Sequence, residues 1–141
     1  MKIDDKTYSL DTNIIIRFLT RDDEALCLKA EDIMRGINEG SITAVCDPVI
    51  LAEAVWVLSS FYRQSKADIS KALAAIVKLD SVLVPNKSRY ILALDIFGNT
   101  NAHFGDACAC AAALECCEGR LFSFDRKLSK IDGISRSERP K

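Results

Sequence analysis

The sequence contains little glycine, little proline and only one histidine. Its 141 residues include six Gly and three Pro, and 49% of them are hydrophobic and 28% charged. This composition excludes a collagen-like protein and a largely disordered one. The length predicts one globular domain rather than two. We place that domain over residues 1–134 and expect a short polar C-terminal tail over residues 135–141.

A long apolar run is also absent. The longest stretch without a charge, residues 96–105, is far shorter than the ~20 residues of a membrane-spanning helix, so we expect no membrane contact. The N-terminus lacks the apolar core of a secretory signal, which predicts a cytoplasmic location. With 19 basic and 20 acidic residues, the net charge does not favour non-specific binding of nucleic acid. Any nucleic-acid partner must therefore be held by a local site.

The cysteines do not predict a zinc site, because none forms a C-x-x-C pair and the lone His103 completes no ligand set. Most of them lie among Ala and Leu, where a free thiol behaves as a small buried apolar side chain in a reducing compartment. We expect this structural role for all six, namely Cys27, Cys46, Cys108, Cys110, Cys116 and Cys117.

Short apolar runs alternate with segments of helical periodicity. The runs predict strands at residues 7–10, 42–46, 81–84 and 121–124. Capping and stop residues predict helices over residues 22–40, 48–62, 65–77 and 106–118. This alternation favours an α/β fold with a central, mainly parallel sheet of four or five strands, flanked by helices on both faces. The tail after Ile134 is so polar that any fifth strand should be short, and we do not expect an ordered C-terminus.

Four acidic side chains stand out from this pattern. Asp11 and Asp125 directly follow predicted strands, and ligands of parallel sheets bind beyond the carboxyl ends of the strands. Glu53 and Asp106 are each the only charge in a long apolar stretch of helix, which should be buried almost all round. Because an ionised carboxylate is rarely buried without a partner, we expect a bound cation to compensate them.

Convergence of the four acids at one site would raise their pKa values unless a divalent ion neutralised the repulsion. Ligation by oxygen alone suits Mg²⁺ or Mn²⁺, and the chemistry it implies is phosphodiester hydrolysis. Simpler explanations remain open for each acid. Asp11 and Asp125 can cap the helices that follow them, and Glu53 can belong to a structural ion pair.

Four motifs spread over nearly the whole chain support the first interpretation. They lie in residues 9–23, 53–58, 104–108 and 122–128. Taken in this order, they resemble the PIN-domain ribonucleases, and more specifically the VapC-type toxins of prokaryotic toxin–antitoxin pairs. His103 departs from the pattern, since it stands where many relatives carry another acid.

The resemblance implies a Mg²⁺- or Mn²⁺-dependent endoribonuclease that hydrolyses RNA. It implies that the catalytic, metal-binding quartet is Asp11, Glu53, Asp106 and Asp125. Small polar or basic positions expected to contact the substrate are Thr12, Asn13, Ser123 and Arg126. The resemblance also implies a homodimer and a small VapB-like antitoxin as partner. Our mechanistic hypothesis is that two acids, Asp11 and Asp106, bind the ion directly, while the other two position metal-bound water.

Further basic residues flank the two acids that follow strands and are candidates for phosphate contacts. They are Arg17, Arg21, Lys127 and Lys130, in addition to Arg126. Two other functions remain open. A phosphoacceptor signalling domain would use Asp11, Asp47 and Lys127, but it leaves Glu53 and Asp106 unexplained. A non-catalytic PIN-like binding module would keep the fold without the chemistry.

Overall fold

The fold is described from a computed structural model, in which residues 3–140 are placed. Met1 and Lys2 begin the segment that we interpret as lacking a secretory signal, and Lys141 ends the predicted tail. These three lie outside the described residues. No helix within residues 3–140 combines the length and the apolar character needed to cross a bilayer.

Strands and helices alternate along the chain. The strands are β1 (Thr7–Ser9), β2 (Thr43–Val45), β3 (Val82–Leu83), β4 (Arg120–Phe122) and β5 (Ser135–Ser137). The α-helices are α1 (Thr12–Leu19), α2 (Glu24–Glu39), α3 (Pro48–Ser60), α4 (Lys66–Val77), α5 (Lys87–Asn99) and α6 (Phe104–Cys116). A 3₁₀ helix, η1 (Arg126–Lys130), lies between the last two strands.

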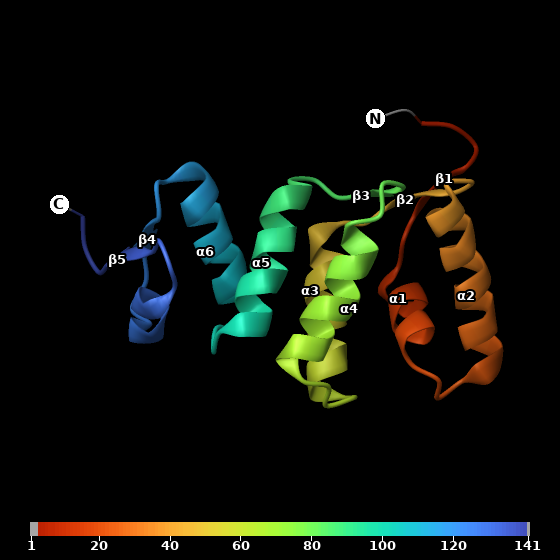
Figure 1. Cartoon of the computed structure of the whole chain (residues 1–141), viewed down its shortest axis with the longest axis horizontal. Helices are drawn as coiled ribbons and strands as arrows, with labels where there is room; N and C mark the ends of the chain where they lie inside the picture. The colour runs from red at the N-terminus through yellow and green to blue at the C-terminus, as the bar shows by residue number, and fades with distance from the viewer. Residues whose placement is uncertain (1–2, 141) are drawn as a thin grey trace.

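The five strands form two parallel sheets. One sheet has the order β1-β2-β3, with Tyr8 opposite Ala44, and the other pairs β4 with β5. The predicted α/β class, with parallel strands flanked by helices, is confirmed. The strands do not join into the single central sheet that we expected. The reason is visible in Figure 1, where α5 and α6 carry β4 and β5 toward the opposite end of the long axis from β1.

The local signals in the sequence fix most helix ends as predicted. Asp23 caps α2 by accepting a hydrogen bond from the Leu26 amide, and α2 ends at Gly40, whose φ of 83° lies in the left-handed region. Pro48 opens α3, and the Ser65 hydroxyl caps α4. These side chains satisfy amide groups that have no partner within the first turn of a helix.

Helix α5 is missing from the prediction. It starts after Asn86, whose φ is 56° and whose side chain makes no capping hydrogen bond. The usual chemical signal of a helix start is therefore absent there. Helix α1 was foreseen only as the helix that Asp11 can cap. Its run of β-branched residues, Ile14 to Ile16, has low intrinsic helix propensity, but Ile15 and Ile16 are buried and their packing stabilises the helix.

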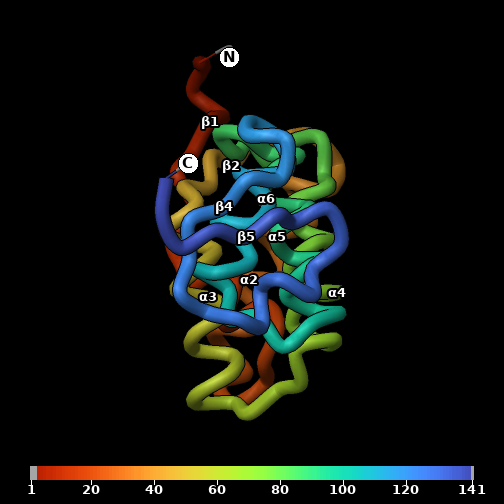
Figure 2. Tube along the Cα trace, turned by 90° about the vertical axis from the view of Figure 1, so that its left-hand side faces the viewer, coloured from red at the N-terminus to blue at the C-terminus, as the bar shows by residue number. Residues whose placement is uncertain are grey.

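The hydrophobic core lies between the first sheet and the helices. Its fully buried side chains include Leu58 of α3, Leu73 of α4 and Leu94 of α5. Among the described residues after Ala113, only Leu128 and Ile131 are buried hydrophobics. The β4–β5 unit is therefore only lightly attached to the core. Figure 2 looks along the molecule from the end that carries this unit.

The β4–β5 pair depends on a close backbone approach at Gly119. A Cβ atom there would lie 1.9 Å from the Gly133 carbonyl oxygen, and the φ of Gly119 is +82°. Both facts require glycine at this position. Strand β5 is short, as we expected of any fifth strand, but it gives residues 135–137 regular structure inside the predicted polar tail.

Two burial predictions are wrong. Neither helix expected to be buried all round is so: α3 exposes Val49, Glu53 and Trp56 on one of its faces, and α6 exposes Gly105, Ala109 and Glu115. The cysteines also divide into two groups: Cys27, Cys46 and Cys110 are buried and Cys108 is partly buried, whereas Cys116 and Cys117 are exposed. The last two lie where α6 ends, so the Ala-rich sequence around them does not bury them.

Candidate active site

Asp11 follows β1 and begins α1. Its Oδ1 accepts a hydrogen bond from the Thr12 backbone amide at 2.9 Å, and its Oδ2 accepts a long one, at 3.5 Å, from the side-chain Nδ2 of Asn13. The capping role that we considered for this exposed residue is confirmed. Only the long contact with Asn13 engages Oδ2, so this oxygen remains able to bind a cation or a water molecule.

Thr12 carries an unusual polar atom. The residue is 3% exposed. Among the buried side-chain nitrogen and oxygen atoms of residues 3–140, only Thr12 Oγ1 and Arg89 Nε lack a hydrogen-bond partner. A buried hydroxyl without a partner is costly and rare in native proteins. Such an atom next to Asp11 is a natural place for a water molecule or a ligand oxygen.

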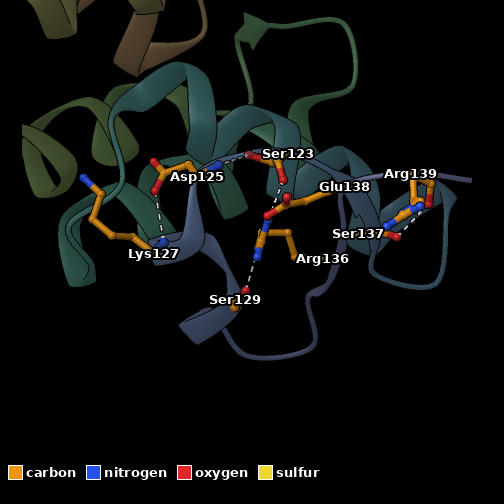
Figure 3. Close-up of polar contacts among 8 residues, drawn as sticks. All are labelled: Ser123, Asp125, Lys127, Ser129, Arg136, Ser137, Glu138 and Arg139. Atoms are coloured by element: carbon orange, nitrogen blue, oxygen red, sulfur yellow. Dashed lines mark hydrogen bonds and ion pairs between the residues drawn. The ribbon is translucent and has the colours of Figure 1, made fainter.

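Asp125 has the corresponding position after β4. Its Oδ1 accepts a hydrogen bond from the Lys127 amide at 3.0 Å, which caps η1, and its own amide donates to Ser123 Oγ at 3.0 Å. Figure 3 shows this turn, with the carboxylate of Asp125 beside the backbone of Lys127. The capping role of Asp125 is therefore also confirmed.

Arg136 of β5 holds this turn in place. Its guanidinium group donates to the Ser123 carbonyl oxygen at 2.7 Å, to Ser129 Oγ at 2.8 Å and to the Glu138 carboxylate at 2.7 Å (Figure 3). Sequence reasoning missed this residue because we assigned it to a polar tail. The available signal was a single arginine among serines, which is a weak indication of a structural role.

Glu53 lies on the exposed face of α3. Val49 precedes it by one turn and Trp56 follows it by one turn, and these two side chains are 69% and 67% exposed. A carboxylate between two exposed apolar side chains is unusual on the surface of a monomer. Because Glu53 is exposed, its carboxylate needs no counter-ion to offset burial. The sequence-based argument that a buried Glu53 requires a bound cation therefore does not hold.

Asp106 is the third residue of α6 and is partly buried. The preceding Phe104 packs edge-on against Phe97, with ring centroids 5.9 Å apart. A negative charge in the first turn interacts favourably with the helix dipole. The pKa of the Cys110 thiol, one turn later, is raised by burial and also by the charge of Asp106.

The four acids are not assembled within one chain. Among residues 3–140, none of them belongs to an ion pair. No group of three or more His, Cys, Asp or Glu side chains in that range is placed to hold a metal ion. Their oxygen donors suit Mg²⁺ or Mn²⁺ in type, but the single chain does not fit the ion in arrangement, and we derive no catalytic step through it.

The candidate phosphate-binding residues behave in two ways. Arg17 forms an ion pair with Asp22 and Arg21 forms one with Glu31, each with an N···O distance of 3.0 Å. The exposed basic residues of η1, namely Arg126, Lys127 and Lys130, take part in no ion pair within residues 3–140. The η1 helix is therefore the better candidate for contact with a phosphate backbone.

A small pocket lies beside η1. It measures about 220 Å³ and its lining includes Lys127, Lys130 and Asn101. The nearby Lys66 donates to the Ala102 carbonyl oxygen at 2.5 Å. Its pKa is lowered by burial and, secondly, by the charge of Lys127. Positive charge is therefore concentrated on this side of the β4–β5 unit.

Asp47 and His103, which the sequence analysis also singled out, both lie at the N-termini of helices. The carboxylate of Asp47, the candidate phosphoacceptor, accepts a hydrogen bond from the Val49 amide at 2.8 Å and caps α3. The exposed His103 occupies the N-cap position of α6, and its side chain makes no capping hydrogen bond.

Comparison with protein families gives one match: the PIN domain, over residues 8–134 of this chain. The matched range contains all four acids and ends one residue before β5. No curated protein matches the chain.

Proposed function

The chain belongs to the PIN domain family, and from this premise we propose that it is a divalent-metal-dependent endoribonuclease. PIN domains are generally metal-dependent nucleases. The proposed reaction is hydrolysis of an RNA phosphodiester, in which the oxygen of water bonds to phosphorus and the bond from phosphorus to a ribose oxygen breaks. The ribose oxygen leaves with a proton.

One observation carries this proposal. Asp11 and Asp125 each follow the carboxyl end of a parallel strand, where α/β proteins bind their ligands, and neither carboxylate is neutralised by a cationic side chain within residues 3–140. Carboxylates at strand ends without a basic partner are donors of the type that a divalent cation binds, although within one chain the two strands belong to separate sheets. The partnerless hydroxyl of Thr12 lies beside Asp11 and supports ligand binding at that strand end.

The proposed roles follow the hypothesis drawn from the sequence. Asp11 and Asp106 would bind Mg²⁺ or Mn²⁺, and Glu53 and Asp125 would position water. When bound, such an ion polarises the phosphate and activates water. Residues expected to contact the RNA are Thr12, Asn13, Ser123 and Arg126. Of these, Ser123 shapes the turn that carries Asp125, because its Oγ accepts from the amide of that residue.

We further propose that the nuclease is a VapC-type toxin that acts in the cytoplasm as a homodimer. A small VapB-like antitoxin would inhibit it by covering the acidic residues. This part of the proposal is supported by the order of the four motifs in the sequence. A short neighbouring gene that overlaps the coding region, and whose product co-purifies with this chain, is the expected observation.

The decisive experiment is an RNA cleavage assay with Mg²⁺ or Mn²⁺. We expect the Asp11→Asn and Asp106→Asn variants to lose about 10²-fold or more in rate, since removal of a group that acts on the reacting atoms has effects of this size. Asp95→Asn is the matched control, because Asp95 is exposed on α5 and has no proposed role. Equal activity in all four proteins would indicate a contaminating nuclease and contradict the proposal.

A second candidate function is a non-catalytic PIN-like binding module. The absence of a metal-binding group of side chains within residues 3–140 of one chain favours it. This candidate predicts RNA binding that is unchanged by EDTA and by Asp106→Asn, together with no cleavage. The nuclease proposal predicts cleavage that EDTA abolishes.

A further inference from the structure

Among residues 3–140, four strands are paired on one side only, namely β1, β3, β4 and β5. Two of them, β1 and β4, carry a large exposed apolar side chain, Tyr8 and Phe122. Within the described residues, β1 pairs with β2 but has no second neighbour, and β4 pairs with β5 but has no second neighbour. Strands of parallel sheets are normally buried between other strands and helices. An unpaired edge exposes a row of amide and carbonyl groups that another strand can bind.

The outward-facing backbone groups of β1 follow from its register with β2. The Leu10 amide donates to the Val45 carbonyl oxygen, and the Thr43 amide donates to the Lys6 carbonyl oxygen. Since alternate residues of a parallel strand direct their backbone groups to opposite sides, Ser9 directs its amide and carbonyl away from β2. Ser9 is also exposed, so these groups are free to pair.

The register of β4 gives a matching edge. The Ser135 amide donates to the Gly119 carbonyl oxygen, and the Ser123 amide donates to the Ser137 carbonyl oxygen. By the same alternation, Phe122 directs its amide and carbonyl away from β5. Ser9 and Phe122 are the last residues of β1 and β4, so each edge offers a donor and an acceptor at the carboxyl end of its strand.

Large apolar side chains surround both edges. Tyr8 of β1 is 58% exposed, Phe122 of β4 is 69% exposed and Phe124 after β4 is 83% exposed. Val49 and Trp56 add the exposed face of α3. Five such residues at strand edges and on one helix indicate a missing partner rather than scattered surface side chains.

The exposed area is large enough for a stable interface. The chain exposes 8761 Å², whereas a compact monomer of its mass exposes about 7,200 Å². The excess of about 1,500 Å² per chain would bury about 3,000 Å² between two chains, which is the size of an obligate dimer interface.

The two edges cannot meet in one chain of this shape, because β1 and β4 lie toward opposite ends of the long axis (Figure 1). A second copy related by a two-fold axis brings its β4 to β1 and receives β4 in return. We propose that the protein forms a strand-exchanged dimer in which β4 of each copy pairs with β1 of the other. Each half of the dimer then contains a five-strand sheet of order β3-β2-β1-β4-β5, with the last two strands from the partner copy.

This exchange completes the candidate active site. Asp11 follows β1 and Glu53 lies on α3, which packs against α1 and also contacts α6, the helix of Asp106. Asp125 follows β4, which lies toward the opposite end of the long axis from β1. If the exchanged strands are parallel, Asp11 and the partner copy's Asp125 lie at the same sheet edge. The shared site rests on the proposed nuclease function, whereas the strand pairing rests on the backbone edges and the exposed apolar residues alone.

The pairing is tested first by mass, using the full chain in size-exclusion chromatography with light scattering. We expect twice the 15.6 kDa of one chain at micromolar concentration. Phe122→Lys places a charge on the β4 edge and should shift the protein to monomer. Phe61→Lys is the matched control, because Phe61 is equally exposed, at 72%, but follows α3 and lies on neither strand.

Hydrogen exchange gives a second readout of the same pairing. Amides of β1 should exchange slowly in the wild-type dimer and faster in Phe122→Lys, although the substitution is in β4. A wild-type monomer, or a dimer that Phe122→Lys leaves intact, would overturn the exchange.

The shared site is tested by co-expressing two inactive variants. Asp11→Asn with Asp125→Asn should recover about a quarter of wild-type cleavage, since half of the dimers are mixed and each mixed dimer has one intact site of two. Asp11→Asn with Glu53→Gln should recover nothing, because both acids come from the same end of the chain. If the wild-type protein cleaves RNA but the first pair of variants recovers no cleavage, the shared site is wrong. A dimer that depends on Phe122 but has no nuclease activity upholds the exchange and refutes the proposed function instead.

Discussion

Thr12, the first residue of α1, and Thr20, its C-cap, allow a sharp test of the unsatisfied hydroxyl. Thr12 and Thr20 are the buried polar residues among residues 3–140, at 3% and 8% exposure. Thr20 Oγ1 donates to the Ile16 carbonyl oxygen at 2.8 Å, whereas Thr12 Oγ1 has no partner. Valine has nearly the shape of threonine, so each Thr→Val substitution removes a hydroxyl without creating a cavity.

The two substitutions should change the free energy of unfolding in opposite directions. An unsatisfied buried hydroxyl costs about 1–3 kcal/mol, so Thr12→Val should stabilise the protein by about 1 kcal/mol. This corresponds to an increase of about 3 °C in Tm for a chain of this length. Thr20→Val loses a formed hydrogen bond and should destabilise the protein by about 1 kcal/mol.

Urea unfolding followed by circular dichroism measures both effects. Protein concentration must be equal in all samples, because the stability of a dimer depends on it. In the RNA cleavage assay, Thr12→Val should be less active although it is more stable. Destabilisation of Thr12→Val by about 1 kcal/mol or more would show that the Thr12 hydroxyl is hydrogen-bonded within the protein and would contradict this prediction.

Three further predictions concern contacts around the fold. Arg136→Gln should lower the free energy of unfolding by about 1–2 kcal/mol, since it breaks charged hydrogen bonds to the turn after β4. The control Arg139→Gln should leave that free energy unchanged, and urea unfolding measures both. Tyr62 donates to Asp22 at 2.6 Å and is the main cause of the lowered pKa of that carboxyl, so Tyr62→Phe should raise this pKa in an NMR titration. The contact therefore stabilises the protein above the ordinary carboxyl pKa, and the stabilisation is lost as pH falls through the lowered value. Burial raises the pKa of the Cys46 thiol from 9.0 to about 11; because the unfolded chain loses that proton first, Tm should fall between about pH 9 and 11.

The sequence predicted the elements whose signals are local. Asp23 and Ser65 cap helices, and a capping side chain needs no tertiary contact to act. The apolar runs found four of the five strands, and the alternation with helices gave the parallel pairing. Helix α5 escaped prediction although Asn86 is of a residue type favoured at N-caps. In the structure Asn86 makes no capping hydrogen bond, so the start of this helix depends on packing.

The candidate site was harder to predict because it depends on tertiary placement. Asp11 and Asp125 were correctly placed after strands, since this follows from the order of elements along the chain. The burial of Glu53 was wrong, because the composition of a helix does not tell which face packs against the protein. Arg136 was missed because its role arises from the pairing of β4 with β5, and its sequence neighbours give no sign of that pairing.

Binding of Mn²⁺ by isothermal titration tests the central claim, that these acids form a metal site. It should be measured for the wild type, Asp106→Asn and the control Asp95→Asn. We expect the control to bind as the wild type does and Asp106→Asn to lose at least about tenfold in affinity. Equal affinity in all three proteins would contradict the claim and remove Asp106 from the site.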